Sequence, residues 1–241
     1  MPLTSAEVTQ KQGVRVSVQG SIKPNTLPRT GSAPVAVSFG GDIGATSPSG
    51  PPQLRGLSIA INRHGRLDTR GLPRCRLGHI DPSTTREAIS ACRSSLIGEG
   101  SFAANVKLPE QSPFPSHGKI LAFNGRLRGQ PAVFAHIYGT RPVPTSVVLP
   151  FVITRTKGTF GTLLSAELPQ VTGDWGYVTG LNMTLKRQFS VGGKKRSYLS
   201  AGCPAPEGFR QVIFPFARTS FSFDGGITLT TTLTRSCRVR G

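Results

Sequence analysis

The chain has 241 residues, of which 37% are hydrophobic and 17% charged, and 29 lysines and arginines against 11 acidic residues give a net charge of +18. That length supports a substantial core, and 29 glycines and 20 prolines with so few charges are unlike a helical bundle or a disordered low-complexity chain. A field of this sign attracts polyanions such as nucleic acid, anionic lipid or acidic polymers, and carries no information about the fold.

The N-terminal part of the chain shows short strand patterns joined by turns. Residues 1–12 are polar and aperiodic, which predicts a flexible lead-in. Apolar and polar residues then alternate at 14–18, 35–39 and 57–61. A period of two is typical of half-buried strands, so we expect three strands here.

One segment, at about residues 82–97, is predicted to be a helix. Thr84 and Glu87 have the spacing of a capping box, in which each residue bonds the backbone of the other. Ile89 and Cys92 follow at helical spacing on one face. We expect this short helix to be the only one.

The rest of the chain returns to strand patterns. The predicted strands cover 102–108, 119–123, 132–138, 146–154, 160–168, 179–191, 196–201 and 212–216, and the stretches 221–223 and 227–233 form a final predicted hairpin. Two of these, 132–138 and 146–154, are apolar on both faces, which predicts a central position in a sheet. The glycine pairs Gly192-Gly193 and Gly225-Gly226 predict hairpin turns.

These patterns together predict a mainly β fold. We expect an antiparallel β-sandwich, or two stacked β units, with one short α-helix. Residues 13–241 are predicted to form one large domain, and the alternative is two β units at about 13–110 and 118–241. Residues 1–13 lack the apolar stretch of a signal peptide, and no apolar run is long enough for a transmembrane segment.

The four cysteines are Cys75, Cys92, Cys203 and Cys237. The economical pairing is Cys75 with Cys92 and Cys203 with Cys237, although four cysteines allow three connectivities. No two cysteines have the close spacing of a zinc-binding pair, so disulfides are favoured over buried thiols or a metal site. Disulfides persist in oxidising compartments, which predicts an extracytoplasmic or secreted protein.

No motif for catalysis, for a metal or for a cofactor is recognisable. The sequence contains neither a nucleophile elbow nor a phosphate-binding loop. The four histidines, His64, His79, His117 and His136, show no metal-ligand spacing, and the carboxylates are scattered. We therefore predict no catalytic residue, no metal and no cofactor.

Basic residues gather in three stretches, at 63–76, at 186–196 and at 235–240. The middle stretch lies on the two arms of a predicted hairpin and provides the candidate anion-binding residues, which are Lys186, Arg187, Lys194, Lys195 and Arg196. The alternative interpretation is a solvated hairpin tip that keeps the protein soluble.

The expected partner of these basic residues is an anionic cell-wall polymer or an anionic membrane surface. Nucleic-acid binders usually add exposed aromatic residues for base stacking, and only Phe189 and Tyr198 accompany the middle stretch. Nucleic acid is therefore the less favoured partner.

A family resemblance rests on several stretches taken together, namely 73–75, Ala91-Cys92, 119–125, 198–204 and 234–237. Over about residues 30–240 the chain resembles a group of exported, β-rich bacterial proteins of uncharacterised function. The resemblance implies export and paired cysteines, and it carries over no functional residue.

The function expected from these features is a binding or structural role without catalysis. We expect an extracytoplasmic β-rich protein that contacts anionic cell-envelope polymers through basic patches. One alternative is a β-protein that binds a lipid or apolar small molecule, motivated by the strands with two apolar faces. A second alternative is a hydrolase whose site is assembled only in the fold.

Overall fold

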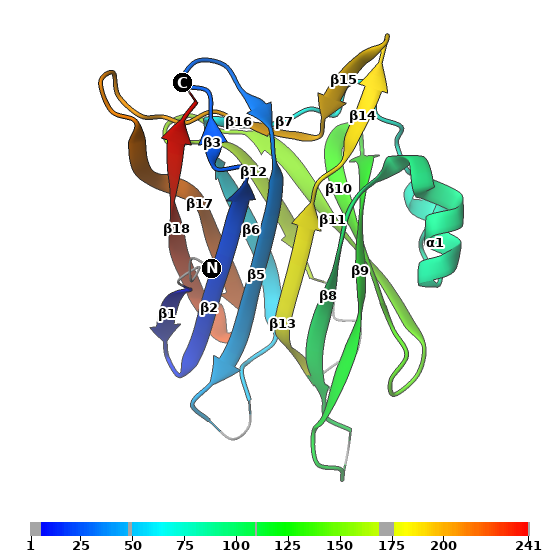
Figure 1. Cartoon of the computed structure of the whole chain (residues 1–241). Helices are drawn as coiled ribbons and strands as arrows, with labels where there is room; N and C mark the ends of the chain where they lie inside the picture. The colour runs from blue at the N-terminus through cyan, green and yellow to red at the C-terminus, as the bar shows by residue number, and fades with distance from the viewer. Residues whose placement is uncertain (1–5, 48–49, 109, 169–175, 241) are drawn as a thin grey trace.

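The structure is one long antiparallel sheet that curls back on itself, with a short helix on its outer side (Figure 1). This computed structural model describes residues 6–47, 50–108, 110–168 and 176–240. The strands are β1 (Glu7–Lys11), β2 (Val14–Lys23), β3 (Thr26–Leu27), β4 (Ala33–Pro34), β5 (Ala36–Ala45), β6 (Leu54–Asn62), β7 (Gly65–Leu67), β8 (Leu96–Val106), β9 (Phe114–Leu127), β10 (Gln130–Gly139), β11 (Thr145–Arg155), β12 (Phe160–Glu167), β13 (Gly176–Leu185), β14 (Gln188–Val191), β15 (Lys194–Ser197), β16 (Leu199–Ala201), β17 (Gln211–Phe223) and β18 (Thr228–Val239). The helix is α1 (Thr85–Cys92), and the 3-10 turns are η1 (Leu77–His79), η2 (Arg93–Ser95) and η3 (Asp224–Gly226). The prediction of a mainly β fold with one short α-helix is confirmed.

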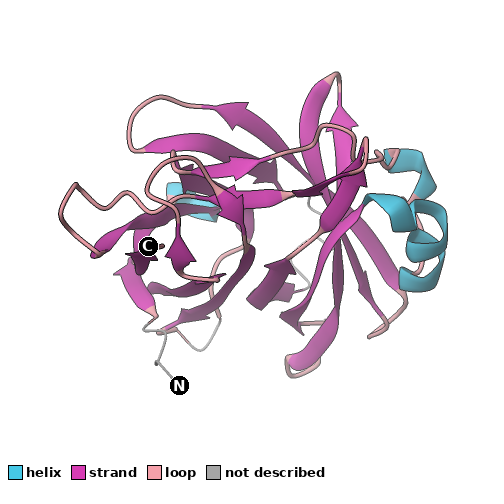
Figure 2. Ribbon diagram, turned by 45° about the horizontal axis from the view of Figure 1, so that its top comes forward, coloured by secondary structure: helices cyan, strands magenta, loops and turns pink. Residues whose placement is uncertain are grey.

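The main sheet has 13 strands in the order β1-β2-β5-β13-β8-β9-β10-β11-β12-β6-β17-β18-β3. Its pairs are antiparallel except for β18 with β3. Some neighbouring strands of the sheet come from distant parts of the chain. Strand β13 lies between β5 and β8, and β6 lies between β12 and β17. Two smaller sheets, β4-β16-β7 and β14-β15, complete the fold. Figure 2 shows the strands wrapped around the interior with the helix outside.

The main core lies on the inner face of the curled sheet. Val14, Val16 and Val18 are buried while the residues between them face outward, as the alternating pattern predicts. They belong to one apolar cluster with Phe221 and Leu233 of the last hairpin. Burying a side chain of this size stabilises the fold by roughly 1.5–3 kcal/mol, so the inner face provides most of the driving force.

Helix α1 begins at the predicted capping box. The Glu87 N–H donates to the Thr84 hydroxyl, and the Thr84 N–H donates to the Glu87 carboxylate at 2.7 Å. The helix ends at Cys92, earlier than predicted, since the chain turns through η2 and becomes strand β8 at Leu96. Beyond this point the chain is held by the disulfide of Cys92 and by the pairing of Leu96 with Phe123 of β9, and no longer by helical hydrogen bonds.

A second apolar cluster fills the space between α1 and the outer face of β9 and β10. It contains Phe123, Phe134, Ala88 and the Cys75–Cys92 disulfide. This cluster explains why the predicted central strand 132–138 is apolar on both faces: β10 has the main core on one side and the helix on the other. The close approach needs Gly125, where a Cβ atom would lie 2.4 Å from the Phe134 ring.

Part of the expected lead-in is instead strand β1, which pairs with β2 from Glu7 opposite Val18 to Lys11 opposite Val14. Gln12 and Gly13 both have positive φ and form the tight turn between the two strands. The pattern was missed because an edge strand with polar side chains carries little apolar alternation. Residues 1–5 lie outside the described residues.

Both predicted disulfides are present. Cys75 is bonded to Cys92 and Cys203 to Cys237, with Cα–Cα distances of 5.4 and 5.7 Å. Two disulfides indicate a protein of a compartment outside the reducing cytoplasm. Within the part of the chain that the structure describes, no helix has the length and apolar character needed to cross a membrane.

Candidate functional site

The three basic stretches of the sequence meet at one end of the sheet, which we call the basic end. Arg66 of β7 lies opposite Ser200 of β16 in the small sheet, and the parallel pairing of β3 with β18 holds the end of the chain nearby. The disulfide between Cys203 and Cys237 ties the third stretch to the segment that follows β16. Figure 1 shows β3, β7, β16 and the β14–β15 hairpin at this end, at the top of the view.

The basic end presents a dense set of exposed cations. They are Arg63, Arg66, Arg70, Arg74, Arg76, Arg128, Lys157, Lys186, Lys194, Lys195, Arg210, Arg238 and Arg240. The third member of the last stretch, Arg235, lies further down β18 and does not belong to this surface. Because these cations share one end of the molecule, their fields add, and the basic end attracts anions more strongly than any single side chain would.

The opposite end of the sheet is close to neutral. Its described connecting segments, which include the turns after β1, β8, β10 and β17, carry Lys107 and Arg141 against Glu110 and Asp224. Arg55 holds Asp224 through two bonds of 2.5 and 2.6 Å, and this contact lowers the pKa of the Asp224 carboxyl. The excess of positive charge in the connecting segments is therefore confined to one end.

The β14–β15 hairpin forms as predicted. Gly192 and Gly193 have φ values of 55° and 73°, the left-handed pair that a two-residue hairpin turn requires. Lys194 and Lys195 follow the turn and are exposed at the tip, and Lys186 is exposed at the base. All five candidate anion-binding residues therefore lie on or beside this hairpin.

Two of these five residues are already held by the protein. Arg196 Nη1 lies 3.2 Å from the Asp68 carboxylate, and Arg187 Nη2 donates to the Ser94 carbonyl at 3.5 Å. The three lysines have no ion pair with any described residue. Lysines 186, 194 and 195 are thus the members of the set that are free to meet an external anion.

Asp68 is the carboxylate of the basic end that pairs with its arginines, and Glu207 is an exposed carboxylate on the loop of Phe209. Burial of Asp68 alone would raise the pKa of its carboxyl, but hydrogen bonds from the Arg70 backbone and side chain, the charge of Arg70 and a bond from Arg196 outweigh that effect. The pKa of Asp68 is therefore below its ordinary value. Asp68 stays ionised at neutral pH and partly offsets the surrounding arginines.

The two aromatic residues that accompany the middle stretch are not available for stacking. Tyr198 is fully buried, and this burial raises the pKa of its hydroxyl. Phe189 is half-buried against the main core. The exposed apolar residues of the basic end are instead Phe209 and Ile213, which are 62% and 71% exposed.

Arg29 orders the loop that presents Phe209. Its guanidinium donates to the carbonyls of Ala205 and Phe209 at 2.8 and 2.9 Å, and also to that of Pro206. Arg29 is consequently a structural residue of the basic end. These bonds hold the loop between residues 205 and 209, so the exposed ring of Phe209 lies on an ordered segment.

A shallow hollow of about 350 Å³ lies beside Ile213 and is bordered by Arg63 and His64. Burial, and after it the charge of Arg63, lowers the pKa of His64. His64 is therefore neutral at neutral pH and does not add to the charge of the basic end.

His136 is fully buried beneath the segment that precedes α1. Its Nε2 lies 2.9 Å from the Ser83 carbonyl, and the hydroxyls of Ser83 and Ser146 lie 3.2 and 3.4 Å from the same nitrogen. A nitrogen that donates to a carbonyl carries the proton and cannot act as the base for either hydroxyl. His136 thus ties this segment to β10. No group of three or more potential metal ligands occurs among the described residues.

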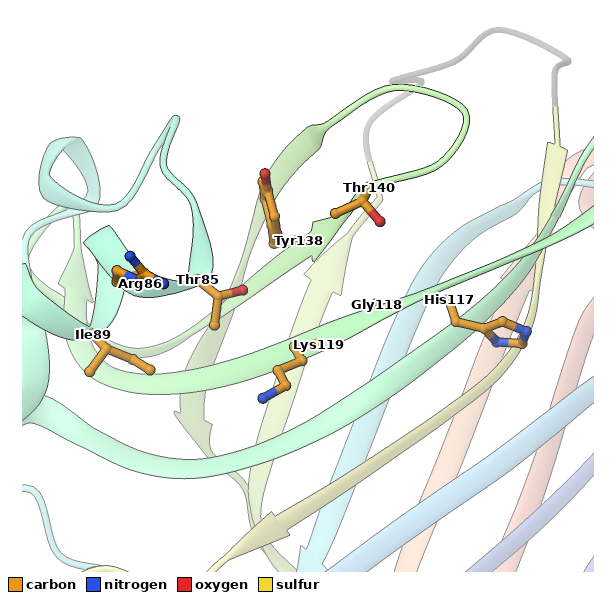
Figure 3. Close-up of a pocket in the computed structure, with 8 residues that line it drawn as sticks. All are labelled: Thr85, Arg86, Ile89, His117, Gly118, Lys119, Tyr138 and Thr140. Atoms are coloured by element: carbon orange, nitrogen blue, oxygen red, sulfur yellow. The ribbon is translucent and has the colours of Figure 1, made fainter.

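A larger hollow lies away from the basic end, between α1 and the outer face of β9 and β10 (Figure 3). It measures about 520 Å³ and is lined by Thr85, Arg86, Ile89, His117, Gly118, Lys119, Tyr138 and Thr140. Sequence reasoning missed it. The available signal was the alternation along β9, which places His117 and Lys119 on the same face as Leu121 and Phe123.

Comparison with protein-family models, curated proteins and solved structures found no match to this chain.

Proposed function

We propose that this is a non-enzymatic, extracytoplasmic protein that binds an anionic polymer of the cell envelope through its basic end. The observation that carries the proposal is the convergence of three basic stretches, distant in sequence, on one end of a sheet whose other end is near neutral. The two disulfides support a location outside the reducing cytoplasm.

The charge distribution itself favours an anionic partner. Like charges gathered on one surface repel one another and reduce the stability of the folded state, and a bound polyanion relieves that repulsion. Lysine is a compact point charge on a flexible stem, which suits repeated phosphate or carboxylate groups without demanding one geometry. Lys194 and Lys195 at the hairpin tip are therefore the residues expected to contribute most per side chain.

The burial of Tyr198 argues against nucleic acid, because the described residues of the basic end do not include a row of exposed rings on which bases stack. An anionic membrane surface is the second candidate. It is supported by Phe209 and Ile213, two exposed apolar side chains among cations, which is the combination that lets a protein insert shallowly into a lipid headgroup region.

The two remaining alternatives gain no support from the described residues. Both hollows carry cationic side chains, unlike the dry cavity that an apolar ligand needs. The buried contacts of His136 do not form a serine–base pair. An apolar-ligand role and a hydrolase role stay predictions from the sequence alone.

The test is binding of the purified protein to immobilised polygalacturonate and to linear polyphosphate. We expect the affinity to fall by about tenfold or more between about 50 and 200 mM salt. The double variant Lys194→Ser/Lys195→Ser should bind more weakly. The control Lys11→Ser/Lys107→Ser removes the same charge far from the basic end and should leave most of the affinity intact.

Three outcomes would count against the proposal. The first is retention of both polymers that does not depend on salt, and the second is an equal loss of affinity in both double variants. The third is tight binding to vesicles of phosphatidylglycerol, but not to either polymer, with loss of that binding in Phe209→Ser/Ile213→Ser. That result would favour the membrane candidate.

A further inference from the structure

The hollow beside α1 is formed where the helix stops covering the outer face of β9 and β10. Phe123 and Phe134 lie opposite each other on this face and are buried under the helix. Four residues further along each strand, Lys119 lies opposite Tyr138 on the same face. The helix begins at this level, so its first turn forms one wall of the hollow and the two strands form its floor.

Cationic side chains reach the hollow from its wall and from its floor. Arg86 comes from the first turn of α1 and Lys119 from β9, with His117 at the edge farthest from the helix (Figure 3). Neither Arg86 nor Lys119 has an ion-pair partner among the described residues. The acidic neighbour of Arg86, Glu87, is bonded to the Thr84 N–H at 2.7 Å in the capping box. Two unpaired cations that line the same hollow suit one carboxylate or phosphate.

The remaining lining combines an aromatic ring with hydroxyl groups. Ile89 on the helix wall and Tyr138 on the strand floor provide apolar surface, and Thr85 and Thr140 add hydroxyls that donate or accept hydrogen bonds. A volume of about 520 Å³ falls within the usual range for small-molecule sites. The ligand that matches this lining has a ring with an apolar face, several hydroxyls and one negative charge.

We infer that this hollow is a binding site for an acidic sugar, a pyranose ring that carries a carboxylate. Arg86 and Lys119 hold the carboxylate, Tyr138 packs against the ring, and the two threonines bond ring hydroxyls. The site goes beyond the proposed polymer binding, because it lies apart from the basic end and uses none of its residues.

In the experiment, the full chain is titrated separately with D-glucuronate, D-glucose and inorganic phosphate. Binding is measured by isothermal titration calorimetry and by changes in NMR chemical shifts. Glucuronate should bind more tightly than either of the other two. The variants Arg86→Gln and Lys119→Gln should each weaken glucuronate binding by about tenfold, the effect of losing one charged hydrogen bond. Tyr138→Leu should weaken it as well.

The control is Arg93→Gln, which removes an exposed arginine just after α1 and outside the hollow. Arg86 and Lys119 are both exposed, so their variants should keep the wild-type unfolding midpoint. Equal affinity for glucose and glucuronate would overturn the role of the carboxylate. Equal affinity for phosphate and glucuronate would overturn the role of the sugar ring and leave a site for simple anions. Unchanged affinity in Arg86→Gln/Lys119→Gln would overturn the site. Polyphosphate contains no sugar ring, so its binding by the same variants reports separately on the basic end and should not change.

Discussion

Glu7 and Arg235 form an ion pair, with Arg235 Nη1 2.7 Å from Glu7 Oε1, although they lie 228 positions apart in the chain. Their side chains are 21% and 12% exposed. Arg235 Nε also donates to the Gly20 carbonyl of β2 at 2.5 Å, and the Thr234 N–H donates to Glu7 at 3.2 Å. The pair therefore joins the first strand of the main sheet to its last hairpin and holds the sheet in its curled form.

Loss of this pair should destabilise the protein more than loss of an exposed ion pair would. We expect Arg235→Gln and Glu7→Gln each to reduce the free energy of unfolding by about 2 kcal/mol, because each leaves a half-buried charge without its partner. Denaturant unfolding of both variants and of the double variant gives the coupling energy. A coupling energy near zero would show that the contact does not close the sheet.

Adding a side chain at Gly125 is expected to reduce the free energy of unfolding. In Gly125→Ala the new Cβ atom would lie 2.4 Å from the Phe134 ring in a closely packed cluster, and we expect a loss of about 1–3 kcal/mol in the free energy of unfolding. The matched control is Gly44→Ala, where no atom lies within 4 Å. Phe134→Leu in the Gly125→Ala background should recover part of the loss, and failure to recover would contradict the proposed clash.

The two disulfides should contribute unequally to stability. They close loops with sequence separations of 17 and 34 residues, for which loop entropy predicts losses of about 3 and 4 kcal/mol respectively. Unfolding of Cys75→Ala/Cys92→Ala and Cys203→Ala/Cys237→Ala measures both losses. Both variants should also weaken polymer binding, since Cys75 lies between Arg74 and Arg76 and Cys237 lies next to Arg238, and all three arginines belong to the basic end.

The capping box of α1 should make a small, pH-dependent contribution to the free energy of unfolding. Thr84→Ala is expected to cost about 1 kcal/mol of stability at neutral pH. The hydrogen bond from the Thr84 N–H, together with the Thr84 side chain, lowers the pKa of the Glu87 carboxyl. The folded state therefore gains stability from Glu87 above the carboxyl's unfolded pKa, and that gain disappears as the pH falls through the lowered folded pKa.

The measurement is the difference in unfolding free energy between wild type and Glu87→Ala at neutral and at acidic pH, since Thr84→Ala keeps the backbone N–H that donates to Glu87. The difference should narrow in acid. A difference that stays constant down to about pH 3, below the ordinary pKa of a glutamate, would contradict the role of Glu87 in the cap.

Removing a counter-charge of the basic end should strengthen polymer binding. Asp68→Asn frees Arg70 and Arg196 from their carboxylate partner, and we expect affinity for polygalacturonate to rise about twofold to threefold, the effect of one partly exposed charge. Glu110→Gln at the opposite end makes the same change in net charge. Equal gains in the two variants would indicate a general charge effect with no preferred surface.

The sequence by itself determined the elements that depend on neighbouring residues. Alternating apolar residues predicted most strands, Gly192-Gly193 predicted the hairpin, and Thr84 with Glu87 predicted the helix start. The pairing of the cysteines was also predicted correctly, because each economical loop joins residues that local structure already brings near each other. All of these signals act over a few residues or within one compact segment.

Only the tertiary structure decided how the strands are ordered and which side chains share a surface. The place of β13 between β5 and β8 depends on contacts between distant segments that leave no local pattern. The same holds for the ion pairing of Arg196 with Asp68, which removes one predicted anion-binding residue from the free set. The hollow of Arg86, Lys119 and Tyr138 exists because α1 packs on one part of β9 and β10 and not on the next. Packing between distant segments, rather than local propensity, therefore forms both candidate sites.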